Sequence, residues 1–166
     1  MFIINDSVVY GNEGVCLITD IVKKEFNSGL IDYYLLKPVS SPKSSIYIPI
    51  NNTTLLNKIH PLISTNEIVE LINSMPEKNT IWIEDNNNRR EEYKKIIYSG
   101  DRIDLIKLIK TLYLKREDLK TNKKKLLTSD DNFFKSAEKI LYDEFAYVLD
   151  IKPDEVRPYI EEQLRC

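Results

Sequence analysis

The sequence predicts an α+β chain of two modules: a small β barrel or curled sheet, followed by an all-α bundle of four to five helices. Between Asp6 and Ile50, short runs of β-branched and aromatic residues alternate with Gly, Asn, Ser and Pro, which is typical of strands and turns. After Asn66, apolar residues recur at steps of three and four, which is typical of helices. The boundary between the two patterns predicts modules at residues 1–60 and 65–166.

The first module is expected to contain four or five strands. The first includes residues 8–10, the second includes residues 15–18 and can continue through Ile21 and Val22, the third spans residues 31–37, and the fourth spans residues 46–50. Glycines at Gly11 and Gly14 permit a sharp first turn, because glycine adopts positive φ angles without steric cost. Further turns are expected at residues 27–29 and 40–44. Pro49 lacks a backbone N–H and therefore favours an edge position. Residues 51–64 are expected to form a connection that contains a short turn and that places His60 in a loop.

The second module contains predicted helices at residues 66–74, 89–98 and 103–120, a fourth helix whose apolar residues recur between Phe134 and Val148, and a fifth at residues 153–164. Ser64 or Thr65 is expected to cap the first, Asp101 to begin the third, and Thr128 or Ser129 to cap the fourth. Pro158 counts against a regular last helix. Residues 77–88 are predicted to be an irregular polar segment interrupted only by the apolar residues 81–83, with Trp82 at the centre.

The residues argue against an enzyme and against a bound metal or cofactor. His60 is the only histidine and precedes a proline, which excludes a histidine-based metal cluster and disfavours a histidine-activated nucleophile. The chain has four glycines and no glycine-rich phosphate loop. Paired carboxylates occur at Glu84–Asp85 and Asp130–Asp131, of which the second pair suits a helix N-terminus.

The cysteine pattern and hydropathy predict a cytoplasmic protein. Cys16 lies in an apolar run and is expected in a core, Cys166 is the last residue and is expected to be loosely held, and two cysteines do not form a disulfide framework. No signal-peptide pattern and no apolar run long enough to span a membrane is present.

Charge is distributed unevenly although the net charge is only −2. Residues 89–125 hold 13 Lys and Arg against 6 Asp and Glu, and residues 126–166 hold 5 against 10. On one face, the basic residues would contact phosphates without reading base sequence; on scattered helix faces they would be solvated. Trp82 is either a packing residue or a wedge for an interface or a DNA groove.

The order of these motifs resembles the CarD/CdnL family, whose N-terminal module is shared with the transcription-repair coupling factor. The resemblance is carried by Asp6-x-Val-Val-Tyr10-x-x-x-Gly14, by a Tyr-x-x-Leu-Lys strand that ends at Lys37, by Ile-x-Ile-Pro at 46–49, and by Leu141-Tyr-Asp-Glu-Phe-Ala146 in a late helix. It spans nearly the whole chain.

The resemblance implies a monomeric, non-enzymatic bacterial transcription regulator. A Tudor-like module would bind the RNA polymerase β subunit, with contacts from Lys24, Phe26, Tyr47 and Pro49. The helical module would hold promoter DNA weakly and modulate open-complex stability, through Trp82, Arg89, Arg90, Lys94, Lys95, Lys124 and Lys125. The alternative is a protein-interaction adaptor of the same fold that does not touch DNA.

The sequence departs from the family pattern at two positions. Tyr47 stands where many members have a basic residue, which shifts the expected polymerase contact toward aromatic stacking. Trp82 lies seven residues before Arg89, farther than the spacing common in the family, so a longer loop is expected between them. Trp82 would then either reach the groove from this loop or serve as a packing residue.

Overall fold

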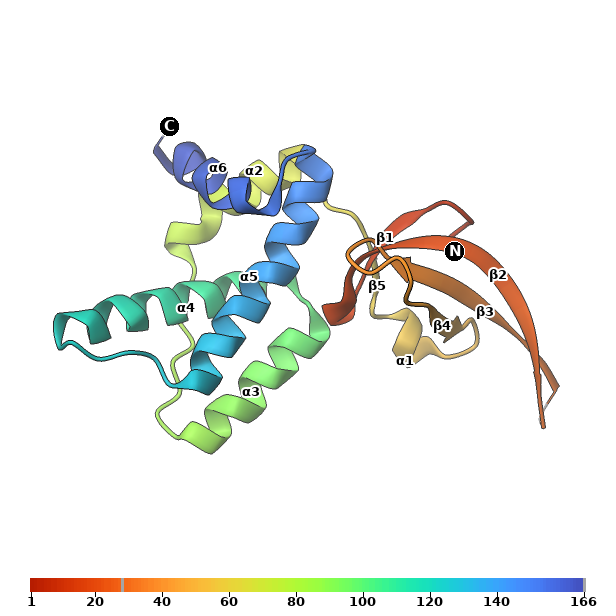
Figure 1. Cartoon of the computed structure of the whole chain (residues 1–166), viewed down its shortest axis with the longest axis horizontal. Helices are drawn as coiled ribbons and strands as arrows, with labels where there is room; N and C mark the ends of the chain where they lie inside the picture. The colour runs from red at the N-terminus through yellow and green to blue at the C-terminus, as the bar shows by residue number, and fades with distance from the viewer. Residues whose placement is uncertain (28, 166) are drawn as a thin grey trace. The chain divides into compact units, whose positions relative to one another are not determined.

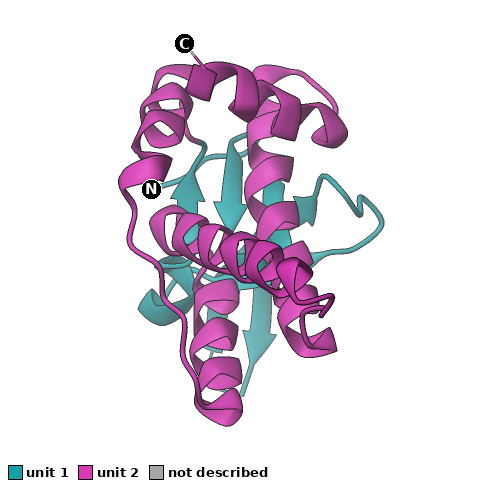
Figure 2. Ribbon diagram, turned by 90° about the vertical axis from the view of Figure 1, so that its left-hand side faces the viewer, with its two compact units in different colours: residues 1–62 teal, residues 63–166 magenta. Residues whose placement is uncertain are grey.

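A computed structural model describes residues 1–27 and 29–165 of the chain, and these form two compact units divided between Leu62 and Ile63 (Figure 2). The predicted turn at residues 27–29 includes Ser28 and the expectation for Cys166 concerns the last residue, so both lie outside the described residues. The α+β prediction is confirmed: strands occupy the first unit, and the second is helical (Figure 1).

The first unit is an open antiparallel sheet of five strands in the order β4-β3-β2-β1-β5. The strands are β1 (Ser7–Tyr10), β2 (Gly14–Phe26), β3 (Gly29–Pro38), β4 (Ile46–Pro49) and β5 (Ile59–Pro61). β2 and β3 form a long curved hairpin, whose register shifts between Ile18 and Asp20 (Figure 1). Because β4 and β5 are not paired with each other, the sheet curls without closing into a barrel.

A short 3-10 turn (Gly11–Glu13) joins β1 to β2, with Gly11 and Gly14 at φ angles of 46° and 77°. Residues 51–64 are more regular than the sequence indicated. They contain helix α1 (Thr53–Leu56) and strand β5, which pairs with β1 and places His60 opposite Val9. The prediction that His60 lies in a loop was therefore wrong. Cys16 is fully buried beside Ile18 and Leu36, as the apolar pattern predicts.

The second unit contains α2 (Thr65–Ser74), α3 (Asn86–Ser99), α4 (Arg102–Thr121), α5 (Thr128–Leu149) and α6 (Pro153–Arg165), with a 3-10 turn at Met75–Glu77. Ser64 caps α2 in a capping box with Glu67, and Asp101 caps α4 by accepting the N–H of Asp104 at 3.0 Å. Gly100 ends α3 at a φ of 67°. α5 departs from prediction, because it begins at Thr128 after Leu127, which makes no side-chain capping bond. Pro158 lies inside α6.

Two buried clusters hold the helical unit together. One joins α2, α5 and α6 around Ile72, Phe145 and Val156, and the other joins α3, α4 and α5 around Tyr93, Leu108 and Phe134. Buried side chains of this size each contribute about 1.5–3 kcal/mol relative to exposure, so these clusters fix the positions of α3 and α4.

Candidate protein and nucleic-acid interfaces

Strand register places the four predicted polymerase-binding residues on one face of the sheet. Tyr47 pairs with Leu35, Pro49 with Tyr33, Lys24 with Ile31 and Phe26 with Gly29. Because side chains alternate along a strand, all four project from the face opposite the buried residues Tyr34, Leu36 and Ile48. We call these four residues, Lys24, Phe26, Tyr47 and Pro49, the sheet surface.

The sheet surface is aromatic and exposed. Tyr47 and Phe26 are 43% and 52% exposed. The Lys24 ammonium lies 3.5 Å from the centroid of the Tyr47 ring, and the Phe26 and Tyr33 rings lie 5.9 Å apart. Cation–π and ring contacts hold these side chains in place before any partner binds, which lowers the conformational entropy lost on binding.

β4 forms one edge of this sheet. It pairs with β3 on one side, and among the described residues no strand pairs with it on the other. An edge of this kind presents backbone donors and acceptors that can accept a partner strand. Tyr47 is at the middle of this edge, so one binding event could use both its backbone and its ring.

Trp82 lies in an extended segment that is attached to the helical core. The Ile81 N–H donates to Thr111 Oγ1 at 2.9 Å, and the Ile81 carbonyl accepts the Tyr93 hydroxyl at 3.0 Å. Trp82 packs partly buried on the cluster of Tyr93 and Leu108. Its indole Nε1–H donates to Glu84 at 3.1 Å.

Two cations lie on the Trp82 ring. The Arg89 guanidinium carbon is 4.3 Å from the ring centroid and the Lys115 ammonium is 4.6 Å from it. Sequence reasoning did not identify Lys115, although its place in the basic part of α4 was a usable signal. Trp82 is therefore fixed by contacts from α3 and α4, with only part of the ring exposed.

The longer loop expected before Arg89 is wrong. Asp85 caps α3 by accepting the N–H of Asn88 at 2.8 Å, so residues 86–88 form the first helical turn. Asn residues are unfavourable in helix interiors, but they are tolerated in a first turn that a cap stabilises. Residues 86–88 therefore belong to α3, and Arg89 of this helix contacts the Trp82 ring.

Arg89 is buried, with a side chain only 3% exposed. Its Nε and Nη2 donate to the two oxygens of Asp130 at 2.9 and 2.8 Å, and Nη1 donates to the Ile83 carbonyl at 2.9 Å. The hydrogen bonds to Asp130 raise the pKa of Arg89 above its ordinary value. This burial leaves Arg89 without the exposed guanidinium that the predicted DNA contact requires.

Arg90, Lys94 and Lys95 are exposed on the outer side of α3. Arg90 and Lys94 are four residues apart and share one face of the helix, where like charges repel by a few tenths of a kcal/mol. Lys94 and Lys95 pair with Glu91 at 3.6 Å and Glu92 at 2.9 Å, but exposed pairs of this type are weak and easily exchanged. We call Arg90, Lys94 and Lys95 the α3 basic face.

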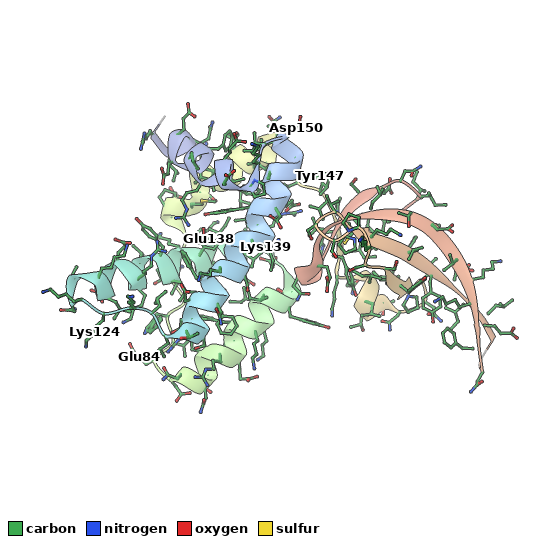
Figure 3. The ribbon with its side chains drawn as sticks, viewed as in Figure 1. Glu84, Lys124, Glu138, Lys139, Tyr147 and Asp150 are labelled. Carbon is green, nitrogen blue, oxygen red and sulfur yellow. The ribbon has the colours of Figure 1, made fainter. Side chains whose placement is uncertain are left out.

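Lys124 lies in the connection from α4 to α5 (Figure 3), as does Lys125, and the two lysines border a cleft together with Arg116 of α4. Arg116 follows Lys115, the residue that covers Trp82. The basic residues of the predicted DNA-binding set thus divide into the α3 basic face, the α4–α5 connection and the buried Arg89.

Family comparisons agree with this division of the chain. Residues 2–61 match the CarD-like/TRCF RID domain, and residues 68–161 match the CarD C-terminal domain. The chain belongs to the CarD family. The matches cover both units, and no curated protein matches the sequence.

CarD-family domains are known from non-enzymatic transcription regulators that interact with RNA polymerase. The two matches make this chain a transcription regulator of the CarD/CdnL type. Within residues 1–27 and 29–165, no helix is long and apolar enough to cross a membrane. The same residues contain no grouping of three or more His, Cys, Asp or Glu side chains arranged to hold a metal ion.

Proposed function

We propose that this CarD-family regulator binds the β subunit of RNA polymerase with its sheet surface and β4 edge, and contacts promoter DNA with its helical unit to change the stability of the open complex. The observation that carries the proposal is the convergence of Lys24, Phe26, Tyr47 and Pro49 on one exposed face of a sheet whose β4 edge pairs with no further strand in the described part of the chain. An aromatic cluster beside a strand edge supplies both parts of a strand-addition interface, main-chain hydrogen bonds and side-chain anchors.

The DNA contact is assigned to the α3 basic face, to the exposed part of Trp82 and to Lys124 and Lys125. Lysine and arginine at these positions would hold the phosphate backbone without reading base sequence. Such a contact is weak when isolated, which agrees with a net charge of −2 for the chain. Attachment to polymerase raises the effective concentration of DNA to about the millimolar range, so a weak contact is sufficient.

A second candidate function is a polymerase-binding adaptor that does not touch DNA. Two residues of the predicted DNA-binding set favour the adaptor, because their side chains are covered. Arg89 is buried, and Arg89 and Lys115 lie on the Trp82 ring. Insertion of Trp82 between base steps would require the Lys115 contact to break. The adaptor keeps the sheet surface as its binding site and differs only in the helical unit.

The polymerase contact is tested by titrating the full chain against an immobilised lobe fragment of the RNA polymerase β subunit. Tyr47→Ala is expected to weaken binding by at least about tenfold, the loss that removal of a central aromatic anchor causes. Tyr147→Ala in α5 (Figure 3) is the matched control, because Tyr147 is also 43% exposed. Equal affinities for the wild type and Tyr47→Ala would exclude Tyr47 as an anchor, and no binding by the wild type would exclude the tether.

A further inference from the structure

A basic cleft of about 540 Å³ lies between the end of α4 and the start of α5. α4 contributes Arg116 and Lys120, α5 contributes Thr128 and Asp131, and the connection contributes Lys123, Lys124, Lys125 and Leu126. Figure 3 labels Lys124 on this connection. The volume falls in the range that binds small ligands, but the lining is cationic where such sites are usually apolar.

Positive charge in the cleft is largely uncompensated. Asp131 is paired with Lys135 at 2.8 Å, and Glu117 is shared by Lys120 at 2.9 Å and Arg116 at 3.8 Å. Among residues 1–27 and 29–165, Lys123, Lys124 and Lys125 take part in no ion pair. Three consecutive exposed lysines repel one another, and an anion bound between them would remove that repulsion.

Arg116 is held at the wall of the cleft by aromatic rings. Its guanidinium carbon lies 4.9 Å from the Phe134 ring centroid and 5.5 Å from that of Tyr113. Its Nε is buried and has no hydrogen-bond partner among the described residues, because the nearby Glu117 Oε1 is 3.8 Å away, beyond hydrogen-bond reach. A buried donor without a partner is costly, so one edge of this fixed guanidinium has its hydrogen-bonding capacity unused.

The start of α5 adds a second source of positive potential. Leu127 precedes the helix and provides no capping side chain, so N–H groups of the first turn have no side-chain acceptor at that position. The first turn also holds two carboxylates, of which Asp130 is occupied by Arg89 and Asp131 by Lys135. A 22-residue helix directs the positive end of its dipole toward its first turn, where anions bind favourably.

Helix-dipole stabilisation of lysine explains only part of this arrangement. Lysines near the end of α4 are favoured by its negative C-terminus, which accounts for Lys120 and Lys123. Lys125 stands three residues before Thr128, next to the positive end of α5, where a cation is unfavourable. Arg116 lies more than one turn inside α4. Glu117 at 3.8 Å compensates part of the charge of Arg116, and a bound anion would compensate Lys125.

We propose that this cleft binds a group of two or more adjacent phosphates, supplied either by successive phosphates of a DNA strand or by a free polyphosphate chain. Lys123, Lys124 and Lys125 provide flexible point charges, Arg116 provides a positioned donor, and Thr128 and the start of α5 provide neutral donors. For the DNA source the inference rests on the proposed function, whereas binding of a free polyphosphate is independent of it.

Calorimetric titration of the full chain with tripolyphosphate at low salt tests the cleft directly. The cleft variant is Lys123→Gln/Lys124→Gln/Lys125→Gln. The control variant removes the same charge from the α3 basic face: Arg90→Gln/Lys94→Gln/Lys95→Gln. We expect the cleft variant to bind tripolyphosphate at least about tenfold more weakly than the wild type, and the control to stay within about twofold, because charge interactions weaken steeply with distance.

All six substituted positions are exposed, so thermal unfolding midpoints should match the wild type and show that folding is retained. Absence of tripolyphosphate binding by the wild type, or equal weakening in both variants, would overturn the inference. A duplex-DNA titration over a range of salt concentrations then identifies the source.

If DNA supplies the phosphates, the plot of log affinity against log salt is less steep for the cleft variant than for the wild type. Its slope decreases in magnitude by about 0.9 for each phosphate that the cleft no longer neutralises. An unchanged slope, in a variant that no longer binds tripolyphosphate, assigns the cleft to a free polyphosphate. If the wild type binds tripolyphosphate but no DNA, the DNA part of the proposed function fails while the cleft remains a phosphate site.

Discussion

The burial of Arg89 with Asp130 predicts that Asp130→Ala strongly destabilises the helical unit. The two side chains are 3% and 2% exposed, and two hydrogen bonds of 2.9 and 2.8 Å join them. Removing the carboxylate leaves the guanidinium buried with the Ile83 carbonyl, at 2.9 Å, as its closest remaining acceptor. Breaking one partner of a buried ion pair costs about 3–5 kcal/mol, a large part of the roughly 5–15 kcal/mol that stabilises a typical domain.

The assay is urea unfolding followed by the fluorescence of Trp82, the only tryptophan of the chain. Because Trp82 packs on the core of the helical unit and contacts Arg89, its emission reports unfolding of that unit. Glu91→Ala is the matched control, since it breaks an exposed pair with Lys94 whose side chains are 69% and 64% exposed. The control is expected to cost between 0 and about 1 kcal/mol.

The double variant Arg89→Met/Asp130→Leu should recover much of the stability, because replacing both charges by apolar groups of similar size removes the unpaired buried charge. Full recovery is not expected, since the Ile83 carbonyl loses a donor. A cost below about 1 kcal/mol for Asp130→Ala, equal to that of Glu91→Ala, would refute the buried pair and return Arg89 to the residues able to contact DNA.

Three further predictions concern caps and buried ionisable groups. Ser64→Ala removes the capping box with Glu67 and should lower the free energy of unfolding by about 1 kcal/mol, measured by urea unfolding. Burial raises the pKa of Tyr93 to about 12. Between about pH 10 and 12 the phenol ionises only in the unfolded chain, so the helical unit should lose stability as the pH rises through this range. Tyr93→Phe should reduce this loss. Burial also raises the pKa of the Cys16 thiol to about 12. In the variant Cys166→Ser, Cys16 is the single thiol. The folded variant should react with a thiol reagent at about pH 8 far more slowly than the same variant unfolded in guanidinium.

The sequence predicted most of the secondary structure because those signals are local. Ser64 and Asp101 cap their helices as predicted, since a cap depends on residues within one turn. Asp85 also caps a helix, but the three asparagines after it resemble a loop, so the start of α3 was predicted too late in the chain. Strand β5 was missed because three residues are too few to show alternation.

The candidate sites depend on contacts between distant residues, which a single sequence does not reveal. Arg89 is separated from Asp130 by 41 residues, and nothing near Arg89 indicates that its charge is buried. Lys115 covers Trp82 from another helix. The sheet surface was easier to predict, because Tyr47 and Phe26 lie in strands whose alternation places them away from the core.

The central claim is that the chain holds RNA polymerase through its first unit and promoter DNA through its second. The most direct test is the lifetime of a promoter open complex after a heparin challenge, with a saturating amount of the full chain. We expect the wild type to change this lifetime. Arg90→Gln/Lys94→Gln/Lys95→Gln should largely remove the change while still binding polymerase, and the control Lys43→Gln/Lys139→Gln/Lys152→Gln should behave as the wild type. If Arg90→Gln/Lys94→Gln/Lys95→Gln changes the open-complex lifetime as much as the wild type does, the DNA contact of the α3 basic face is contradicted and the adaptor is favoured.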